Sequence, residues 1–144
     1  MTQRQNWSET ARLYIEKAHA ALREARNNQN LNPNVAISRA YYSTFYMAQA
    51  ALATREENPR GHDGVHHRFS FHFVRTGLIA QEMLKILTQL IQSRIKADYD
   101  IKTFYNTEDA IRRIEMAENF TETIEAMLTK ESFLFSAEKP ADEM

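Results

Sequence analysis

The chain has 144 residues, of which 43% are hydrophobic and 26% charged, with a formal net charge of −1. This is the composition of one ordinary globular domain, and it excludes a protein that binds nucleic acid through overall positive charge. The absence of cysteine excludes disulfides, thiol catalysis and thiolate metal sites. No stretch reaches the roughly 20 apolar residues of a membrane span, and no apolar segment typical of a signal peptide opens the chain, so we expect a cytoplasmic protein that does not enter a membrane.

Three glycines and three prolines favour long helices over strands and turns, and apolar residues recur with helical spacing in five stretches. Asn32 can cap the second helix, with Pro33 at its first position, and Gly77 is expected to end the third. We expect helices at about 8–26, 33–54, 65–75, 80–96 or 80–99, and 107–128. Short connections predict an all-α fold, an antiparallel up-down four-helix bundle with an extra short helix. We expect a single domain at 1–130 and a flexible tail at 131–144.

The second helix has two faces and should be central to the fold. One face is apolar and predicts core residues: Ile37, Tyr41, Phe45, Ala48 and Leu52. The other mixes aromatic rings with polar groups and predicts the lining of a cleft or subunit interface: Val35, Arg39, Tyr42, Tyr46 and Gln49. Alternatively, the tyrosines belong to the core with their hydroxyls hydrogen-bonded. A cleft lined in this way could stack bases and bind phosphate.

Arg94 lies among apolar residues of the fourth helix, in line with Leu87 and Leu90. Burying a charged group destabilises the fold unless the group is paired with an opposite charge or serves to bind a ligand. Asp98 follows one turn later, so the two side chains either form an ion pair that orients the helix end or present an arginine that binds an anion.

Four of the five histidines lie between His62 and His72. Gly61 and Gly64 argue against a helix around His62, and no carboxylate pattern completes a zinc site. We therefore expect no metal, and the sequence also lacks the glycine-rich loops that bind nucleotide cofactors. A solvated loop is the simplest interpretation; proton transfer by His62 or His67 is the alternative.

Several short segments, in this order, resemble the HEPN family of helical domains, in particular its small stand-alone prokaryotic members. The segments are Arg39–Tyr42 with Phe45, His62, Phe69 with Phe73–Gly77, Arg94–Tyr99, and Ala110, Ala117 and Phe120. The resemblance covers about residues 8–128.

The resemblance implies a bundle that forms a homodimer with a cleft at the interface. Many family members resemble toxins of toxin–antitoxin pairs encoded beside a minimal nucleotidyltransferase. In the catalytic branch, an arginine and a histidine separated by four to six residues cleave RNA without metal. The arginine can bind phosphate through two N–H groups, and the histidine can move the proton of the 2′-hydroxyl.

This chain departs from that pattern, because positions 99–101 after Arg94 hold no histidine. Asp98 and Tyr99 occupy the expected place, but neither a carboxylate nor a phenol transfers protons readily near pH 7 unless its pKa is strongly shifted. Two functional hypotheses remain, besides a helical bundle that resembles the family only in its fold. One is a toxin or defence component that binds or cleaves RNA, with Arg94, Asp98 and Tyr99 as catalytic candidates. The other is a non-catalytic dimer that serves as a nucleotide-binding or scaffold subunit for a nucleotidyltransferase. The binding candidates for RNA or nucleotide are Arg39, Tyr42, Tyr46 and His62.

Overall fold

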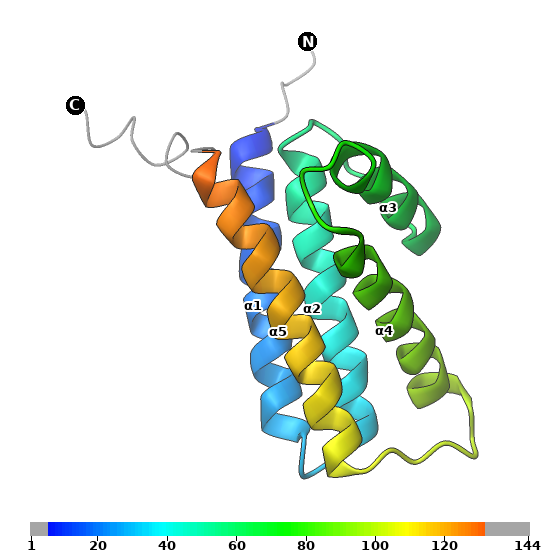
Figure 1. Cartoon of the computed structure of the whole chain (residues 1–144). Helices are drawn as coiled ribbons and strands as arrows, with labels where there is room; N and C mark the ends of the chain where they lie inside the picture. Colours follow the sequence, from blue (N-terminus) through cyan, green and yellow to red (C-terminus); the bar gives the residue numbers. More distant parts are fainter. Residues whose placement is uncertain (1–5, 132–144) are drawn as a thin grey trace, which may run out of the picture.

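A computed structural model describes residues 6–131 of the chain. They form the helices α1 (Trp7–Asn28), α2 (Pro33–Ala53), α3 (His62–Phe69), η1 (Ser70–Val74), α4 (Gln81–Tyr99) and α5 (Thr107–Lys130). The four long helices run alternately down and up, and α3 and η1 lie beside one end of the bundle (Figure 1). The described residues include no strand, so the predicted all-α, antiparallel four-helix bundle with an extra short helix is confirmed.

The predicted tail at 131–144 falls, apart from its first residue, outside the described residues. None of the helices among residues 6–131 combines the length and the hydrophobicity needed to cross a bilayer.

Helix α2 is the centre of the bundle because it packs against α1, α3, α4 and α5. Its predicted core face is confirmed, since all five side chains are buried: Ile37, Tyr41, Phe45, Ala48 and Leu52. The second face differs from the prediction at one position. Gln49 is also buried and donates a hydrogen bond of 3.2 Å to the carbonyl oxygen of Pro59. Gln49 therefore belongs to the interior of the monomer.

Alanine is the commonest buried residue of α1 and α2. These alanines have no exposed surface: Ala11, Ala18, Ala21, Ala25, Ala36, Ala40, Ala48, Ala50, Ala51 and Ala53. A methyl group keeps neighbouring backbones apart by very little, so helices that meet through alanine can pack closely.

Helix α3 begins three residues earlier than the sequence predicted. The prediction placed its start at Val65 and took two glycines as evidence against a helix, but the helix begins at His62. Gly61 is the extended residue before the first turn, with φ −83° and ψ 153°, and Gly64 lies inside that turn. A helical glycine costs about 1 kcal/mol, which the burial of Val65 and Phe69 outweighs.

The chain after α3 widens into a π-helical turn, which the sequence did not predict. The amide of Arg75 donates to the carbonyl oxygen of Ser70 at 2.9 Å, across five residues. Gly77 then ends the segment in the left-handed region, with φ 82°, as expected of a C-terminal cap.

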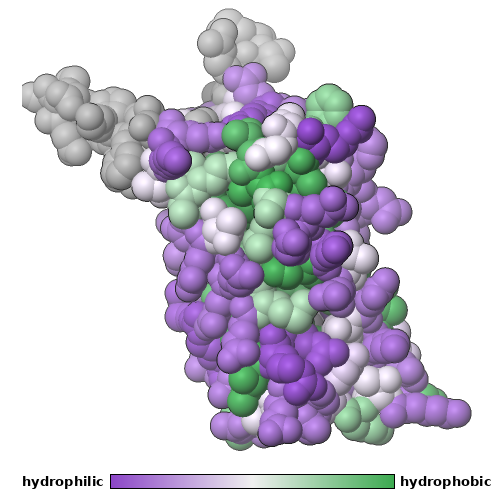
Figure 2. All heavy atoms as spheres, in the orientation of Figure 1, coloured by the Kyte–Doolittle hydropathy of each residue, from purple (hydrophilic) through white to green (hydrophobic). Residues whose placement is uncertain are grey.

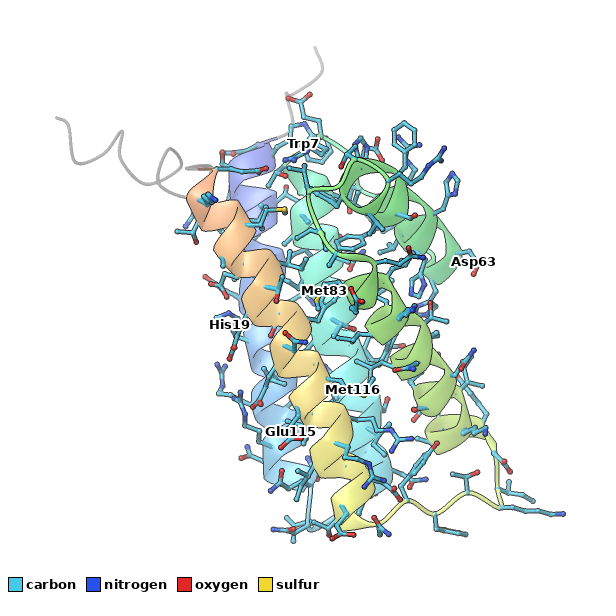
Figure 3. The ribbon with its side chains drawn as sticks, viewed as in Figure 1. Trp7, His19, Asp63, Met83, Glu115 and Met116 are labelled. Carbon is cyan, nitrogen blue, oxygen red and sulfur yellow. The ribbon has the colours of Figure 1, made fainter. Side chains whose placement is uncertain are left out.

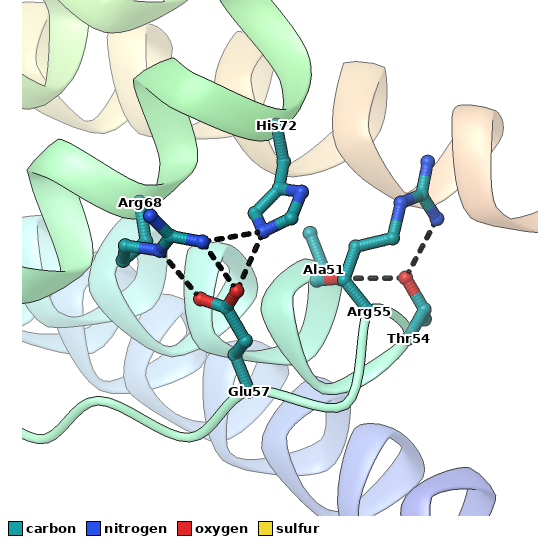
Figure 4. A network of polar contacts seen from close by, with 6 residues as sticks. All are labelled: Ala51, Thr54, Arg55, Glu57, Arg68 and His72. Carbon is teal, nitrogen blue, oxygen red and sulfur yellow. Dashed lines mark hydrogen bonds and ion pairs between the residues drawn. The ribbon is translucent and has the colours of Figure 1, made fainter.

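One carboxylate ties α3 and η1 to the loop after α2 (Figure 4). Glu57 accepts hydrogen bonds from Nε and Nη2 of Arg68 at 2.8 and 2.6 Å, and its Oε2 lies 2.7 Å from Nε2 of His72. These hydrogen bonds, chiefly those from Arg68, lower the pKa of Glu57 to about 2. The cluster helps to fix the orientation of α3.

Asn34, in the first turn of α2, holds the connector between α4 and α5. Its Nδ2 donates to the carbonyl oxygens of Ala97 at 3.1 Å and Thr103 at 2.9 Å, and its Oδ1 accepts from the amide of Tyr105 at 2.9 Å. One side chain thus satisfies three backbone groups where α4 ends. This contact positions the last turns of α4 against α2.

Candidate functional site

Arg94 projects from α4 onto α2, and only 13% of its side chain is exposed. Its Nε donates to Oδ2 of Asp98 at 3.0 Å, and its Nη2 donates to the hydroxyl of Tyr42 at 2.8 Å and, more weakly, to that of Tyr99 at 3.5 Å. Asp98 also accepts a hydrogen bond of 3.1 Å from Ser38 of α2. We call Arg94, Asp98, Tyr42 and Tyr99 the Arg94 cluster.

The guanidinium of Arg94 lies between two aromatic rings. Its Cζ is 5.2 Å from the ring centre of Tyr42 and 5.3 Å from that of Tyr99, distances at which a cation is attracted to the ring face. No hydrogen bond among residues 6–131 uses its Nη1. Tyr99 is 68% exposed, so this side of the cluster is open to solvent. The arrangement holds the guanidinium of Arg94 in a fixed orientation and leaves some of its N–H donors without a hydrogen-bond partner among residues 6–131.

A row of tyrosines continues from the Arg94 cluster towards α1. The rings of Tyr42 and Tyr46 are 5.9 Å apart, and both are half-buried. Arg39 lies 5.4 Å from the ring centre of Tyr42, and Lys17 of α1 lies 5.3 Å from that of Tyr46. Two aromatic rings are therefore flanked by three cationic side chains.

The side chain of Arg39 already contacts a neighbouring helix of the bundle. Its Nε lies 2.9 Å from Oε1 of Glu24 on α1, at ion-pair distance but without hydrogen-bond alignment. Because the partner carboxylate is 58% exposed, the pair is screened by solvent and weak. An incoming anion can compete for Arg39 at little cost.

His62 approaches the cluster from α3. Its Nδ1 is 2.7 Å from the hydroxyl of Tyr41, and its ring centre lies 6.2 Å from that of Tyr42 and 4.7 Å from that of Phe45. Burial, together with the positive charge of Arg94, lowers the pKa of His62. The neutral imidazole is therefore favoured at neutral pH.

The contact with Tyr41 selects one form of this imidazole. Tyr41 is fully buried, its burial raises the pKa of the phenol, and the hydroxyl has no other acceptor among residues 6–131. The phenol therefore donates to Nδ1, and neutral His62 carries its proton on Nε2. In that form Nε2 of His62 is a hydrogen-bond donor rather than a base.

The structure brings all seven sequence-predicted residues onto one side of the bundle, although not all into direct contact. Arg94, Asp98, Tyr99 and Tyr42 touch one another. Tyr46, Arg39 and His62 join them through the ring of Tyr42.

Sequence reasoning missed Lys17, Ser38 and the hydroxyl of Tyr41. Lys17 is an exposed lysine of an amphipathic helix, and Tyr41 was assigned only to the core. Their roles depend on contacts between helices, so no local pattern marks them. Among residues 6–131 no group of three or more histidine, aspartate or glutamate side chains is arranged to hold a metal ion.

The model of the HEPN domain family matches residues 11–127. The chain belongs to the HEPN family. A HEPN relative from Methanocaldococcus jannaschii, named "Putative toxin MJ0142", is 36% identical over 97 residues, which cover 67% of this chain and 66% of the relative. A second protein from that organism, named "Putative toxin MJ0605", is 40% identical over 56% of this chain and 62% of its own length. A protein from Thermotoga maritima, named "UPF0332 protein", is 28% identical over 85% of this chain and 88% of its own.

The family membership confirms the predicted resemblance. This HEPN chain spans just under two thirds of the length of the two relatives whose names describe toxins.

Proposed function

We propose that this chain is a toxin-type HEPN protein that binds RNA through the Arg94 cluster and the tyrosine row beside it. The observation that carries the proposal is the partly buried guanidinium of Arg94, held by Asp98 and Tyr42 with donors left over. A guanidinium held in this way binds phosphate without first losing side-chain freedom. The names of two relatives support a toxin-type role.

The tyrosine row supports a nucleic acid as the ligand. Nucleic-acid bases stack on aromatic side chains, and nearby cations bind the phosphates that link them. Tyr42 and Tyr46 provide two rings, and Lys17, Arg39 and Arg94 lie against their faces. The Nε2–H of His62 adds a donor for a phosphate or a base edge. These features favour single-stranded RNA, whose bases are free to stack.

The test is binding and cleavage of a fluorescent single-stranded RNA pool in EDTA. Wild type should bind, Arg94→Ala should bind at least tenfold more weakly, and Arg94→Lys should recover only part of the loss because an ammonium lacks the planar fork. Arg12→Gln, which removes an exposed charge on α1, is the matched control and should bind as wild type does. The absence of wild-type binding at about 100 µM, the weak end of sequence-independent binding, would refute the proposal.

We propose further that a second copy of the chain completes the site. Exposed apolar side chains occur at the beginning of α2, near the end of α4 and in the connector that follows it: Val35, Ile95, Ile101 and Phe104, with 39%, 47%, 86% and 86% exposed. Exposed apolar groups gathered in this way are typical of an interaction surface. Light scattering at micromolar concentration should report a dimer, and Ile101→Glu with Phe104→Glu should convert it to a monomer. A monomeric wild type would contradict this part of the proposal.

A non-catalytic role is the second candidate, and one observation favours it. The positions that would carry the family's histidine hold none, and His62, the nearest substitute, presents Nε2–H rather than a free lone pair. The chain would then be a nucleotide-binding or scaffold subunit of a nucleotidyltransferase. RNA binding without cleavage in EDTA, together with co-purification of a co-expressed minimal nucleotidyltransferase, would support this role, whereas cleavage lost in Arg94→Ala would support a ribonuclease.

A further inference from the structure

A second polar site lies on the opposite side of α4, in a groove between α4 and α5. The groove has a volume of about 470 Å³, and its main polar lining comes from six side chains: Gln89, Gln92, Lys96, Tyr105, Arg112 and Arg113. In Figure 2 the lower half of the face between these helices is mostly hydrophilic. Met116, which also lines the groove, lies on the side of α5 turned towards α4 (Figure 3). We call this the α4–α5 groove.

Arg113 is held in a fixed orientation within the groove. Its Nε donates to Oγ of Ser93 at 3.3 Å and its Nη1 to the carbonyl oxygen of Asp109 at 3.4 Å. Its Cζ lies 5.2 Å from the ring centre of Tyr105. No hydrogen bond among residues 6–131 uses Nη2. The side chain is only 23% exposed, so its remaining donors are pre-positioned for a ligand.

The charges of the groove do not cancel. Within residues 6–131, Asp109 is the one carboxylate that forms ion pairs with the arginines of the groove, at 2.7 Å from Arg112 and 3.7 Å from Arg113. Lys96 forms no ion pair with any residue of the described part of the chain, although the negative charge of Asp100, which accepts hydrogen bonds from Lys102 and Thr103, lies near enough to interact with it. Three cations therefore face one directly paired carboxylate and one more distant carboxylate, which leaves an excess of positive charge at the groove, although the chain as a whole has a net charge of −1.

We propose that the α4–α5 groove binds a phosphomonoester dianion, with the organic group of the ligand lying along Gln89 and Gln92. The excess positive charge attracts a dianion, and guanidinium groups match the geometry of its oxygens. Inorganic phosphate would leave most of the groove empty, whereas about 470 Å³ lies within the range of small-molecule sites. The glutamine amides offer donors and acceptors for an attached base or sugar. This site is separate from the proposed RNA site and does not depend on it.

The probes are AMP, adenosine, and one short RNA made with either a 5′-phosphate or a 5′-hydroxyl. Their binding is measured by NMR of the backbone amides. AMP should shift signals of α4 and α5 at the groove, and adenosine should not. Binding of AMP alone would identify a free nucleotide as the ligand, and binding also of the phosphorylated RNA would identify a strand end. Affinity should fall below a pH of about 6, where the phosphate dianion takes up one proton and becomes a monoanion.

Matched variants separate this site from the Arg94 cluster. Arg112→Gln and Lys96→Gln, which remove exposed charges without disturbing Arg113, should each weaken AMP binding at least fivefold. Arg12→Gln, with the same charge change on α1, should bind AMP as wild type does, and AMP should still shift the α4 and α5 signals at the groove in Arg94→Ala. Equal shifts with AMP and adenosine, no shift at millimolar AMP, or unchanged affinity in both groove variants would overturn the proposal.

Discussion

The hydroxyl of Tyr41, in the middle of the bundle, lies 2.7 Å from Nδ1 of His62 at the first residue of α3. This hydrogen bond connects a fully buried residue of the central helix to the one histidine in residues 6–131 whose ring contacts Tyr42 of the Arg94 cluster. The position and the proton of His62 therefore depend on a residue with no exposed surface.

Replacing Tyr41 with phenylalanine should lower the free energy of unfolding by about 1 kcal/mol, the usual net value of a hydrogen bond. The ring contacts with Phe45 and Tyr42 stay. Nδ1 of His62 loses its donor, so 15N NMR should report a larger population of the Nδ1–H form than in wild type. Tyr99→Phe, which removes a hydroxyl from an exposed ring, is the control, and equal stability of all three proteins would contradict the assignment.

Arg94→Ala should raise the pKa of His62. The charge of Arg94 lowers that pKa in the native protein, and its removal favours the protonated imidazole. An NMR titration of the His62 ring protons against pH measures the change. The same titration in Arg12→Gln should match wild type; a His62 pKa unchanged in Arg94→Ala would show that the two side chains are not coupled.

Asn34→Ala should destabilise the protein by about 2 kcal/mol, because three backbone groups at the end of α4 lose their partner. Asn34→Asp should be at least as damaging, since a carboxylate would face the two carbonyl oxygens that the amide now binds. Urea unfolding measures both. Asn27→Ala, at an exposed position of α1, should stay within about 0.5 kcal/mol of wild type, and a similarly small effect at Asn34 would refute the role given to it.

Glu57 should contribute to stability above pH 4.5, its ordinary pKa, and lose that contribution as the pH falls. The folded protein holds this pKa at about 2, so the unfolded chain binds more protons between these values and acid favours unfolding. Glu57→Gln should therefore be less stable than wild type at pH 7, and the difference should shrink between pH 4.5 and 2. Glu56→Gln, next in sequence and exposed, should show no such pattern; a pH-independent difference for Glu57→Gln would count against the proposed pKa.

Helical periodicity was enough to predict most of this fold. Core positions such as Ile37, Phe45, Phe120 and Leu128 are buried as their spacing indicates. In a long helix many residues define the apolar face, so one residue that breaks the pattern does not change the prediction. The start of α3 and the π-helical turn after it were not predicted. Both lie in a short segment whose structure depends on tertiary contacts, in particular those of Glu57 with Arg68 and His72.

The contacts of the candidate site that join residues of the same helix could be predicted from the sequence. The spacing of Arg94 and Asp98 indicated a pair, and they form one at 3.0 Å. The hydrogen bond from Arg94 to Tyr42 joins residues 52 positions apart, and the contact of Lys17 with Tyr46 joins α1 to α2. The sequence alone does not show which faces of two helices are turned towards each other. Contacts between residues of different helices can therefore be identified only in the packed structure.

The buried alanines of α1 and α2 determine which amino-acid substitutions the protein can tolerate. Cores made of large side chains are usually damaged by truncation, which leaves holes. Here the smallest side chains determine how near the helices lie, so an added methylene or ring at Ala18, Ala40 or Ala51 would push the helices apart. In a saturation library, therefore, the positions that reject nearly every replacement should include residues with almost no side chain. The buried positions of α4 and α5 are mostly larger residues, and these should accept apolar replacements of similar volume more readily.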